Sequence, residues 1–301
     1  MPNVIITGAT SGIGLAITRY FASESSSSTQ NNKIAMLDIN ATTGPGIASS
    51  LAAEYPNAVI VFRKCDVSSW EEQAAVFREL YENEFEGKLD IVVANAGVSE
   101  RGYTTLVEHE KGGADGPRKP DLSVLDINLS GVIFSVKLAI YYMDLKPAEE
   151  KERGLVICTA SNAGLYALPT APLYAASKFG VVGLVRSTAL LVEDKGIRIN
   201  ALAPAVLGML PLSPSPNILT RADIIGITET NIAPKELYQG MIITPMETLI
   251  KAVDGFAKGG REVNGQIAEV HGENVTVREA HGFVDGDTER NLGRFRGLGW
   301  A

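Results

Sequence analysis

Apolar residues recur along the chain in two alternating patterns. Seven short runs rich in β-branched residues are typical of buried strands, and they lie at 3–8, 33–38, 58–66, 89–97, 153–161, 196–204 and 264–272. Between them, apolar residues are spaced by three or four positions, as in helices, for example at 12–24, 70–85, 121–142 and 172–194. This alternation predicts a single doubly wound α/β domain, with a parallel sheet of about seven strands and helices on both faces.

Three segments interrupt the alternation, and each is predicted to be a loop. The Ser- and Asn-rich segment 23–32 indicates a solvated surface insertion, and 99–121 has the Gly and Pro content of a loop. Segment 205–245 mixes apolar residues with prolines and is predicted to be a substrate loop or lid. The domain is therefore assigned to 1–271. The polar tail 272–301 is either disordered or docked on a neighbouring subunit.

Composition narrows the class of partner. The 301 residues carry a formal charge of −8 without a dense run of Lys or Arg, which argues against nucleic acid or an anionic membrane surface. The opening apolar run is short and lacks a basic flank, so no signal peptide or membrane span is expected and the location should be cytoplasmic. Cys65 and Cys158 have no metal-ligand spacing, so they are interpreted as buried reduced thiols and no metal is expected.

The first predicted strand runs directly into TGATSGIG, which is followed by a predicted helix. Gly8, Gly12 and Gly14 would let the backbone turn sharply and approach a pyrophosphate, while the helix amino terminus offers unpaired N–H groups. Ser11 and Ile13 lie in the same turn and are assigned to the same site. A tight turn without a ligand is the alternative, although the strand before it and the helix after it favour dinucleotide binding.

The second predicted strand ends at an acid, Asp38, which lies 24 residues after Gly14. That is close to where a carboxylate can bind the adenosine ribose hydroxyls, and Ile39 is assigned to the same site. Because a carboxylate there repels a 2′-phosphate, the cofactor predicted is NAD rather than NADP. Alternatively, Asp38 caps the following helix.

The third and fourth predicted strands also end in polar or small residues. Asp66 and Val67 follow the third strand, and Asp66 either contacts adenine or acts as the N-cap of the next helix. Asn95, Ala96 and Gly97 follow the fourth strand, where small residues would let a flat ring lie close to the backbone.

Residue types after the fifth strand favour acid–base chemistry. Tyr174 and Lys178 are four positions apart and share one face of a predicted helix. A phenol with a pKa near 10 needs a nearby cation to exchange its proton easily, and Lys178 can supply that charge. Ser161 would bond the substrate oxygen, unless it serves only to form a turn. A solvated helix face is the alternative for the Tyr and Lys pair.

Taken together, TGATSGIG, NAG, the Asn of LDINLSG, the Ser of ICTASNAG and YAASK resemble the short-chain dehydrogenase/reductase family over about residues 3–271. The resemblance implies a Rossmann fold, with Ser161, Tyr174 and Lys178 as catalytic residues. It is nearest to the NAD-dependent branch that includes 15-hydroxyprostaglandin dehydrogenase-like enzymes. Family members also use an Asn, here Asn128, to hold a water linked to the lysine. Their common pairing through the helices of Asn128 and Tyr174 implies a homodimer or homotetramer.

The chain departs from the family pattern after the sixth strand. Pro204 is kept, but Ala205 replaces a usual Gly and Met209 stands where a Thr normally bonds the nicotinamide carboxamide. The carboxamide is therefore expected to rely on the backbone around Val206 and Leu207.

These observations predict an NAD-dependent oxidoreductase that interconverts a secondary alcohol and a ketone on a bulky hydrophobic small molecule, such as a lipid-like, terpenoid or polyketide compound. In this hypothesis Tyr174 exchanges the alcohol proton and hydride passes to nicotinamide C4. Two alternatives stay open: an NADPH-dependent ketoreductase, and a pericyclase, isomerase or binding protein on the same fold without redox turnover.

Overall fold

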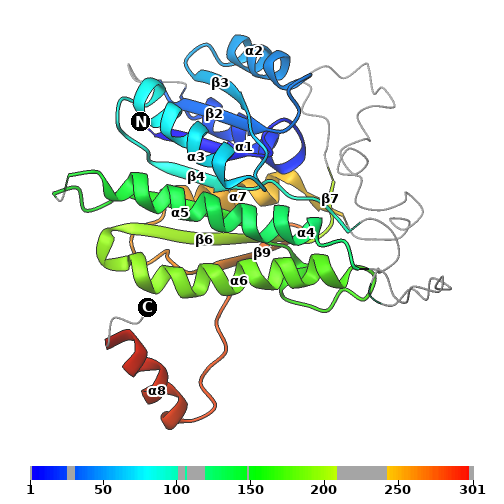
Figure 1. Cartoon of the computed structure of the whole chain (residues 1–301), viewed down its shortest axis with the longest axis vertical. Helices are drawn as coiled ribbons and strands as arrows, with labels where there is room; N and C mark the ends of the chain where they lie inside the picture. Colours follow the sequence, from blue (N-terminus) through cyan, green and yellow to red (C-terminus); the bar gives the residue numbers. More distant parts are fainter. Residues whose placement is uncertain are drawn as a thin grey trace.

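The computed structural model describes residues 2–25, 31–100, 106, 119–147, 149–208 and 243–297. Its centre is an eight-stranded sheet with the order β10-β9-β6-β5-β4-β1-β2-β3, flanked by helices (Figure 1). The predicted doubly wound α/β fold is confirmed. The sheet has one strand more than predicted, and that strand, β10, pairs antiparallel with β9.

The strands of the large sheet are β1 (Asn3–Thr7), β2 (Lys33–Asp38), β3 (Val59–Lys64), β4 (Ile91–Ala94), β5 (Gly154–Thr159), β6 (Ile197–Pro204), β9 (Ile267–His271) and β10 (Asn274–Arg278). Every residue of β1 and β4 is buried. Strands covered on both faces need apolar residues at successive positions, which explains why these segments form continuous apolar runs rather than alternating ones.

Helices cover both faces of the sheet. One face carries α1 (Gly12–Ser23), α2 (Gly44–Glu54) and α7 (Met246–Lys258), and the other carries α3 (Trp70–Glu79), α5 (Gly131–Asp144) and α6 (Pro172–Val192). Shorter turns are η1 (Leu80–Glu84), α4 (Ser123–Leu125), η2 (Asp126–Ser130), η3 (Asn162–Gly164) and η4 (Glu193–Lys195). Each face has its own buried cluster, with Phe21 and Leu249 in one and Phe77 and Val185 in the other. Burial of this apolar area is the main stabilising contribution.

The carboxyl-terminal segment is more ordered than its polar composition suggested. β10 lies within the predicted tail and extends the sheet, and α8 (Gly286–Gly297) stands apart from the sheet (Figure 1). The predicted lid 205–245 lies mostly outside the described residues. Its two ends pair as β7 (Leu207–Gly208) and β8 (Thr244–Pro245).

Two helical segments within the described residues, Ser123–Asp144 and Pro172–Lys195, are long and apolar enough to cross a membrane by length and composition. Both contribute residues to the buried cluster on one face of the sheet, for example Val136 and Val185. Packing against the sheet accounts for their apolar composition without a membrane.

Both cysteines are free and buried, which confirms the prediction of reduced buried thiols. Burial raises the pKa of the Cys65 thiol to about 12, and it does the same for Cys158. Both thiols are therefore protonated at neutral pH and are poor nucleophiles. Within the described ranges, no group of three or more His, Cys, Asp or Glu side chains is placed to hold a metal ion.

Candidate active site

The direction of winding changes at β1, which lies between β2 and β4 in the sheet. β1 pairs in parallel with both neighbours, so the carboxyl ends of all three strands open at one edge. In open parallel sheets, ligands bind in the crevice outside the carboxyl ends at such a point. This edge, which we call the ligand edge, is where the segments after β1, β2, β4, β5 and β6 meet. These segments contain the predicted cofactor and catalytic residues.

The turn after β1 has the conformation that a phosphate-binding turn requires. Gly8 and Gly12 have φ angles of +63° and +50°, in the left-handed region that side chains disfavour. At Gly14, a Cβ atom would lie 2.1 Å from the carbonyl oxygen of Gly8. Ser11 is the N-cap of α1 without a side-chain cap hydrogen bond, and the first turn contains no acid. The N-terminal N–H groups and the positive helix end therefore fit an anion such as a dinucleotide pyrophosphate.

Replacing Gly14 by alanine is expected to damage this turn. Because the new methyl group would meet backbone that cannot move aside, Gly14→Ala should lower the free energy of unfolding by about 2–3 kcal/mol and weaken NADH binding at least about tenfold. Urea unfolding and fluorescence titration with NADH measure the two effects. Gly46→Ala in α2 is the matched control, since a Cβ there would meet nothing within 4 Å. Equal effects of the two substitutions would contradict the close approach at Gly14.

Asp38, at the end of β2, joins that strand to the glycine-rich turn. Its Oδ2 accepts a hydrogen bond from the backbone N–H of Thr10 (3.1 Å), and its Oδ1 accepts one from Asn40 N–H (3.0 Å). The carboxylate is therefore held at the edge of the pyrophosphate turn rather than at the N-cap of α2, which is Thr43. The neighbouring Ile39 side chain is 63% exposed, an unusual position for an isoleucine and one that a flat apolar group could cover.

At the end of β3, the structure corrects one alternative for Asp66. The N-cap of α3 is Ser69, whose Oγ accepts a hydrogen bond from Glu72 N–H (3.1 Å). Asp66 Oδ1 instead accepts bonds from the N–H and the hydroxyl of Ser68, so the acid closes a local turn. Val67 is buried, and its carbonyl accepts a hydrogen bond from the side chain of Gln73 (2.6 Å).

Asn95, after β4, ties three strands together at the ligand edge. Its Nδ2 donates to the carbonyl oxygens of Thr7 (3.0 Å) and Gly8 (3.4 Å), and its Oδ1 accepts a hydrogen bond from Thr159 Oγ1 (3.0 Å). The N–H groups of Asn95 and Ala96 both donate to Thr7 Oγ1. The side-chain amide of Asn95 thus holds β1, β4 and β5 together. The backbone next to Asn95 is then the surface that a cofactor would meet.

The predicted catalytic side chains lie together on this edge. Ser161 is the N-cap of η3, which packs closely on α6, since a Cβ at Gly164 would lie 2.6 Å from the carbonyl oxygen of Lys178. On α6, the ammonium of Lys178 lies 5.6 Å from the ring centre of Tyr174. That ammonium is buried and donates a hydrogen bond to the carbonyl oxygen of Thr159 (2.8 Å). The glycine turn, the phenol and the ammonium therefore share one end of the sheet.

Burial shifts the pKa values of both Tyr174 and Lys178. Burial raises the pKa of Tyr174, and a hydrogen bond with Ser161 opposes that rise. Burial also lowers the pKa of Lys178 to about 8. The hydrogen bond with Ser161 therefore favours the phenolate, and burial makes the Lys178 ammonium easier to deprotonate than an exposed lysine.

Asn128 reaches the edge from η2, a π-helical turn between α4 and α5. Its Oδ1 accepts a hydrogen bond from Val98 N–H and its Nδ2 donates to Val98 O, both at 2.8 Å, so the side chain is fixed against the segment after β4. A Cβ at Gly97 would lie 3.2 Å from Asn128 Oδ1 and 3.5 Å from Lys178 Nζ. A side chain at position 97 would therefore crowd Asn128 and would contact the ammonium of Lys178. A π-helical turn at this point is typical of functional sites.

The segment after β6 runs along the same edge. Pro204 ends β6, the N–H of Ala205 donates to Val270 O (2.9 Å), and the carbonyl of Val206 accepts from Thr244 N–H (2.8 Å). Leu207 pairs with Thr244 in the small sheet. These pairings fix the backbone predicted to meet the nicotinamide, while position 209 lies outside the described residues.

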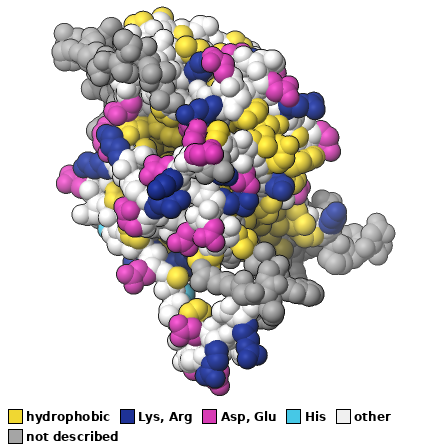
Figure 2. Space-filling model, turned by 90° about the vertical axis from the view of Figure 1, so that its left-hand side faces the viewer, with side chains coloured by type: hydrophobic (Ala, Val, Ile, Leu, Met, Phe, Trp, Pro, Cys, Tyr) yellow, Lys and Arg dark blue, Asp and Glu magenta, His cyan; other side chains and the backbone are white. Residues whose placement is uncertain are grey.

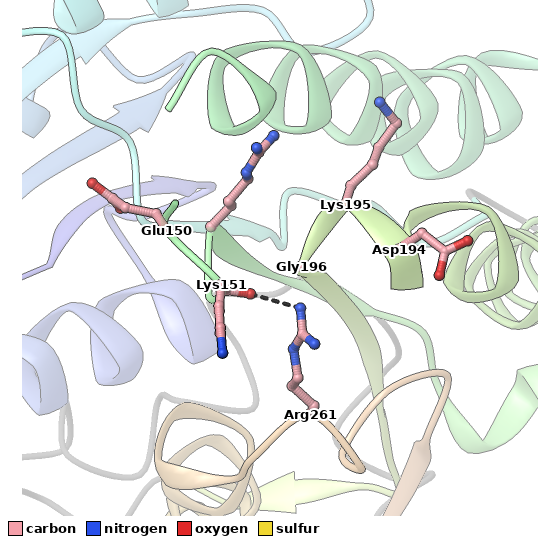
Figure 3. Close-up of a pocket in the computed structure, with 7 residues that line it drawn as sticks. Glu150, Lys151, Asp194, Lys195, Gly196 and Arg261 are labelled. Carbon is pink, nitrogen blue, oxygen red and sulfur yellow. Dashed lines mark hydrogen bonds between the residues drawn. The ribbon is translucent and has the colours of Figure 1, made fainter. Parts of the chain in front are cut away.

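A polar cavity of about 230 Å³ lies at the opposite end of the sheet (Figure 3). It is lined by residues that precede β5 and β6, together with Arg261, so it opens at the amino ends of those strands. Arg153 pairs with Asp144 (2.7 Å), and Arg261 donates to the carbonyl oxygen of Lys151 (2.8 Å). We therefore distinguish this cavity from the ligand edge.

Several residues that support the site were missed by sequence reasoning. Thr159 holds both Asn95 and Lys178, Ser177 accepts a hydrogen bond from Asn128 (3.3 Å), and Glu100 caps the catalytic helix. For Thr159, its place two residues before the motif Ser is a usable signal. The contact of Glu100 spans 73 residues, so local sequence carries no signal for it.

Comparisons with known proteins agree with this geometry. A family model described as short chain dehydrogenase matches residues 2–209. The short-chain dehydrogenase/reductase prx7 of Penicillium rubens is 30% identical over 274 residues, covering 90% of this chain and 86% of the relative. The 5'-hydroxyaverantin dehydrogenase of Dothistroma septosporum is 31% identical over 279 residues, covering 90% and 84%.

A human relative and a solved structure extend the comparison. Human 15-hydroxyprostaglandin dehydrogenase [NAD(+)] is 31% identical over 202 residues, which is 66% of each chain. The crystal structure of levodione reductase superposes with a TM-score of 0.69 at 24% identity, covering 90% of this chain and 96% of the reductase. At that identity the likeness shows the shared fold.

Proposed function

Because the chain belongs to the short-chain dehydrogenase family and is therefore a nicotinamide-dependent oxidoreductase, we propose that it uses NAD to interconvert a secondary alcohol and a ketone on a bulky hydrophobic small molecule. One observation carries the proposal. The glycine-rich turn, the phenol of Tyr174 and the ammonium of Lys178 lie at one edge of the sheet, at the point where winding reverses.

In this proposal each group at the edge has one task. NAD, when bound, supplies a hydride acceptor at nicotinamide C4. Gly8, Gly12 and Gly14 bring backbone N–H groups to the pyrophosphate, and Asp38 accepts hydrogen bonds from the ribose hydroxyls. Ala96 and Gly97 offer a small backbone surface on which a flat ring can lie.

The proton is handled by the side chains of the chain itself. Ser161 donates a hydrogen bond to the substrate oxygen and holds it beside Tyr174. The phenolate of Tyr174 takes the alcohol proton during oxidation, and the resulting phenol returns a proton to the oxygen during ketone reduction. Lys178 lies beside the Tyr174 ring and stabilises negative charge that develops on the phenol. Asn128 holds the segment after β4 in place, beside Gly97 and Lys178.

Asp38 is expected to decide the choice between the two nicotinamide dinucleotides. Asp38→Asn keeps an oxygen for the Thr10 N–H but removes the charge that repels a 2′-phosphate, so the ratio of kcat/KM for NADP to that for NAD should rise about 30-fold. Initial rates with both cofactors measure this ratio. Asp254→Asn in α7 is the control, because that carboxylate pairs with Tyr20 and Lys258 instead. A wild-type protein that binds NADPH more tightly than NADH would overturn the assignment of NAD.

The substrate class is supported by both the chain and its relatives. The residues after Ser161 include Leu165, partly buried, and Tyr166, 47% exposed, which offer apolar surface near the catalytic group. Relatives include a dehydrogenase named for 5'-hydroxyaverantin and one named for 15-hydroxyprostaglandin, and both names specify a hydroxyl group on the compound. A panel of hydrophobic secondary alcohols with NAD, followed by NADH absorbance, tests the class directly. Transformation of a panel compound without any NADH formation would support an isomerase instead.

The assembly proposed is a homodimer or homotetramer formed through α5 and α6. These helices, with the residues that follow α5, expose large apolar side chains at Ile133, Tyr141, Leu145, Phe179, Leu190 and Leu191. Apolar side chains gather along the side of the molecule that carries these helices (Figure 2). Exposed apolar patches of this kind mark interaction surfaces. A cytoplasmic location is proposed with the rest of the function.

A further inference from the structure

A carboxylate beside the catalytic helix has one oxygen that the protein leaves without a partner. Among the buried side-chain nitrogen and oxygen atoms of the described residues, Glu100 Oε1 is the one without a hydrogen bond. Burying an acceptor without a donor is costly, and native proteins rarely leave such an atom without a reason.

The other oxygen of the same carboxylate, Oε2, has hydrogen-bond partners in α6. Glu100 Oε2 accepts hydrogen bonds from the N–H groups of Leu173 (3.0 Å) and Tyr174 (3.3 Å), in the first turn of α6. Ala171, the N-cap residue, provides no side-chain cap, and Pro172 has no N–H. Glu100 therefore caps the helix from a distant segment, with its negative charge at the positive helix end. Capping requires only one oxygen, so Oε1 is left for another partner.

Glu100 also connects two segments that carry proposed site residues. It follows Val98, which is bonded to Asn128 through both its N–H and its carbonyl oxygen. On its other side it binds the backbone N–H of Tyr174 itself. The Glu100 side chain thus joins the segment after β4, which would meet the nicotinamide, to the first turn of α6, which carries Tyr174.

We propose that Glu100 is a specificity-determining residue, whose Oε1 accepts a hydrogen bond from a second hydroxyl group close to the reacting carbinol of the substrate. The proposal rests on the function proposed above. Oε1 would favour neutral substrates with a second hydroxyl over substrates that carry only the reacting alcohol. It would disfavour substrates with a carboxylate where the second hydroxyl would lie. The charge on Glu100 strengthens the first interaction and repels the second.

Glu100→Gln separates this role from helix capping. The two N–H groups of α6 require an acceptor, so the amide oxygen of the glutamine takes the place of Oε2 and its NH₂ group takes the place of Oε1. The cap is kept, whereas the free position changes from a charged acceptor to a neutral donor. The variant is nearly isosteric with glutamate, and thermal unfolding checks that it folds like the wild type.

Three probes share one benzylic secondary alcohol and differ only in the neighbouring group: sec-phenethyl alcohol (methyl), styrene glycol (hydroxymethyl) and mandelate (carboxylate). With wild-type protein and NAD, kcat/KM for styrene glycol should exceed that for sec-phenethyl alcohol about tenfold, and mandelate should be the poorest. In Glu100→Gln the glycol preference should fall severalfold, because the amide NH₂ can donate to the glycol hydroxyl only as a neutral group, and mandelate should gain relative to sec-phenethyl alcohol. Glu262→Gln is the matched control, since its carboxylate accepts a backbone N–H in an exposed loop after α7.

Measuring the binding of the three probes makes the test independent of turnover. Titration calorimetry of the same probes into the NADH-loaded protein gives Kd ratios even if none of them is oxidised. A wild type that shows no glycol preference in either rates or Kd values, or a Glu100→Gln variant that keeps the preference, overturns the proposal. Failure of the proposed function gives a different result, because then NADH is not formed from any probe or from the alcohol panel.

Discussion

Tyr174→Phe is expected to reduce kcat for alcohol oxidation about a thousandfold while NADH binds within about threefold of wild type. Loss of a general acid–base group costs this much, whereas the phenyl ring keeps the packing of the first turn of α6. Initial rates of NADH formation and a fluorescence titration with NADH measure the two quantities. Both must be taken at the same pH, because burial raises the pKa of the phenol and a hydrogen bond with Ser161 opposes that rise.

Tyr142→Phe is the matched control for this substitution. Tyr142 is a buried tyrosine of α5, and it packs against Tyr81 in the core. It should keep turnover close to wild type, so a general effect of removing a buried hydroxyl can be separated from loss of the acid–base group. Turnover that survives Tyr174→Phe would reject the proton-transfer role and revive an isomerase or a binding protein on this fold.

Lys178→Met is expected to lower kcat about a hundredfold or more and to change how stability depends on pH. Burial lowers the pKa of Lys178 from its ordinary value of 10.5 to about 8. Between these pH values the unfolded chain holds more protons than the folded one, so this group makes the free energy of unfolding rise with pH. The wild type should gain about 2 kcal/mol relative to Lys178→Met between pH 7.5 and 10.

The comparison with the variant is necessary because other groups titrate in the same range. Burial raises the pKa of Cys65 to about 12, so its contribution to stability is lost as pH rises above about 9 in both proteins. Cys158 interacts with the charge of Lys178, so its titration is part of the difference between the two proteins. Urea unfolding of the two proteins at several pH values gives the difference directly. A difference that does not change with pH would show that Lys178 is not held in a desolvated site.

Lys146→Met tests whether any buried lysine would behave in this way. Lys146 is also buried, but its ammonium pairs with Asp90 (2.6 Å) and bonds the carbonyl oxygen of Arg153 (2.6 Å). Removing it leaves Asp90 without that cation and should cost about 3 kcal/mol of stability. Turnover should remain, since this lysine lies at the end of the sheet opposite the ligand edge.

The positions proposed for catalysis and cofactor binding could be identified in the sequence because their signals are local. A helix brings residues four positions apart to one face, so Tyr174 and Lys178 could be paired from their spacing, and glycines directly after a strand indicate a turn that approaches a phosphate. Order along the chain also determines the order of the βα units. These rules hold whatever the rest of the fold does, which is why the doubly wound sheet and its ligand edge could be predicted.

Contacts between distant segments were decided only by the tertiary structure. Asn95 lies at the edge where the sequence placed it, but only the structure shows that its amide joins β1, β4 and β5. Glu100 caps a helix that begins 72 residues later, and β10 extends the sheet although its composition suggested a polar tail. Such contacts depend on which loops and strand edges meet in space. A polar side chain can form its hydrogen bonds with nearby backbone, with water or with a distant segment, and its chemistry is suited to all three. Only the folded arrangement determines which of these partners it has.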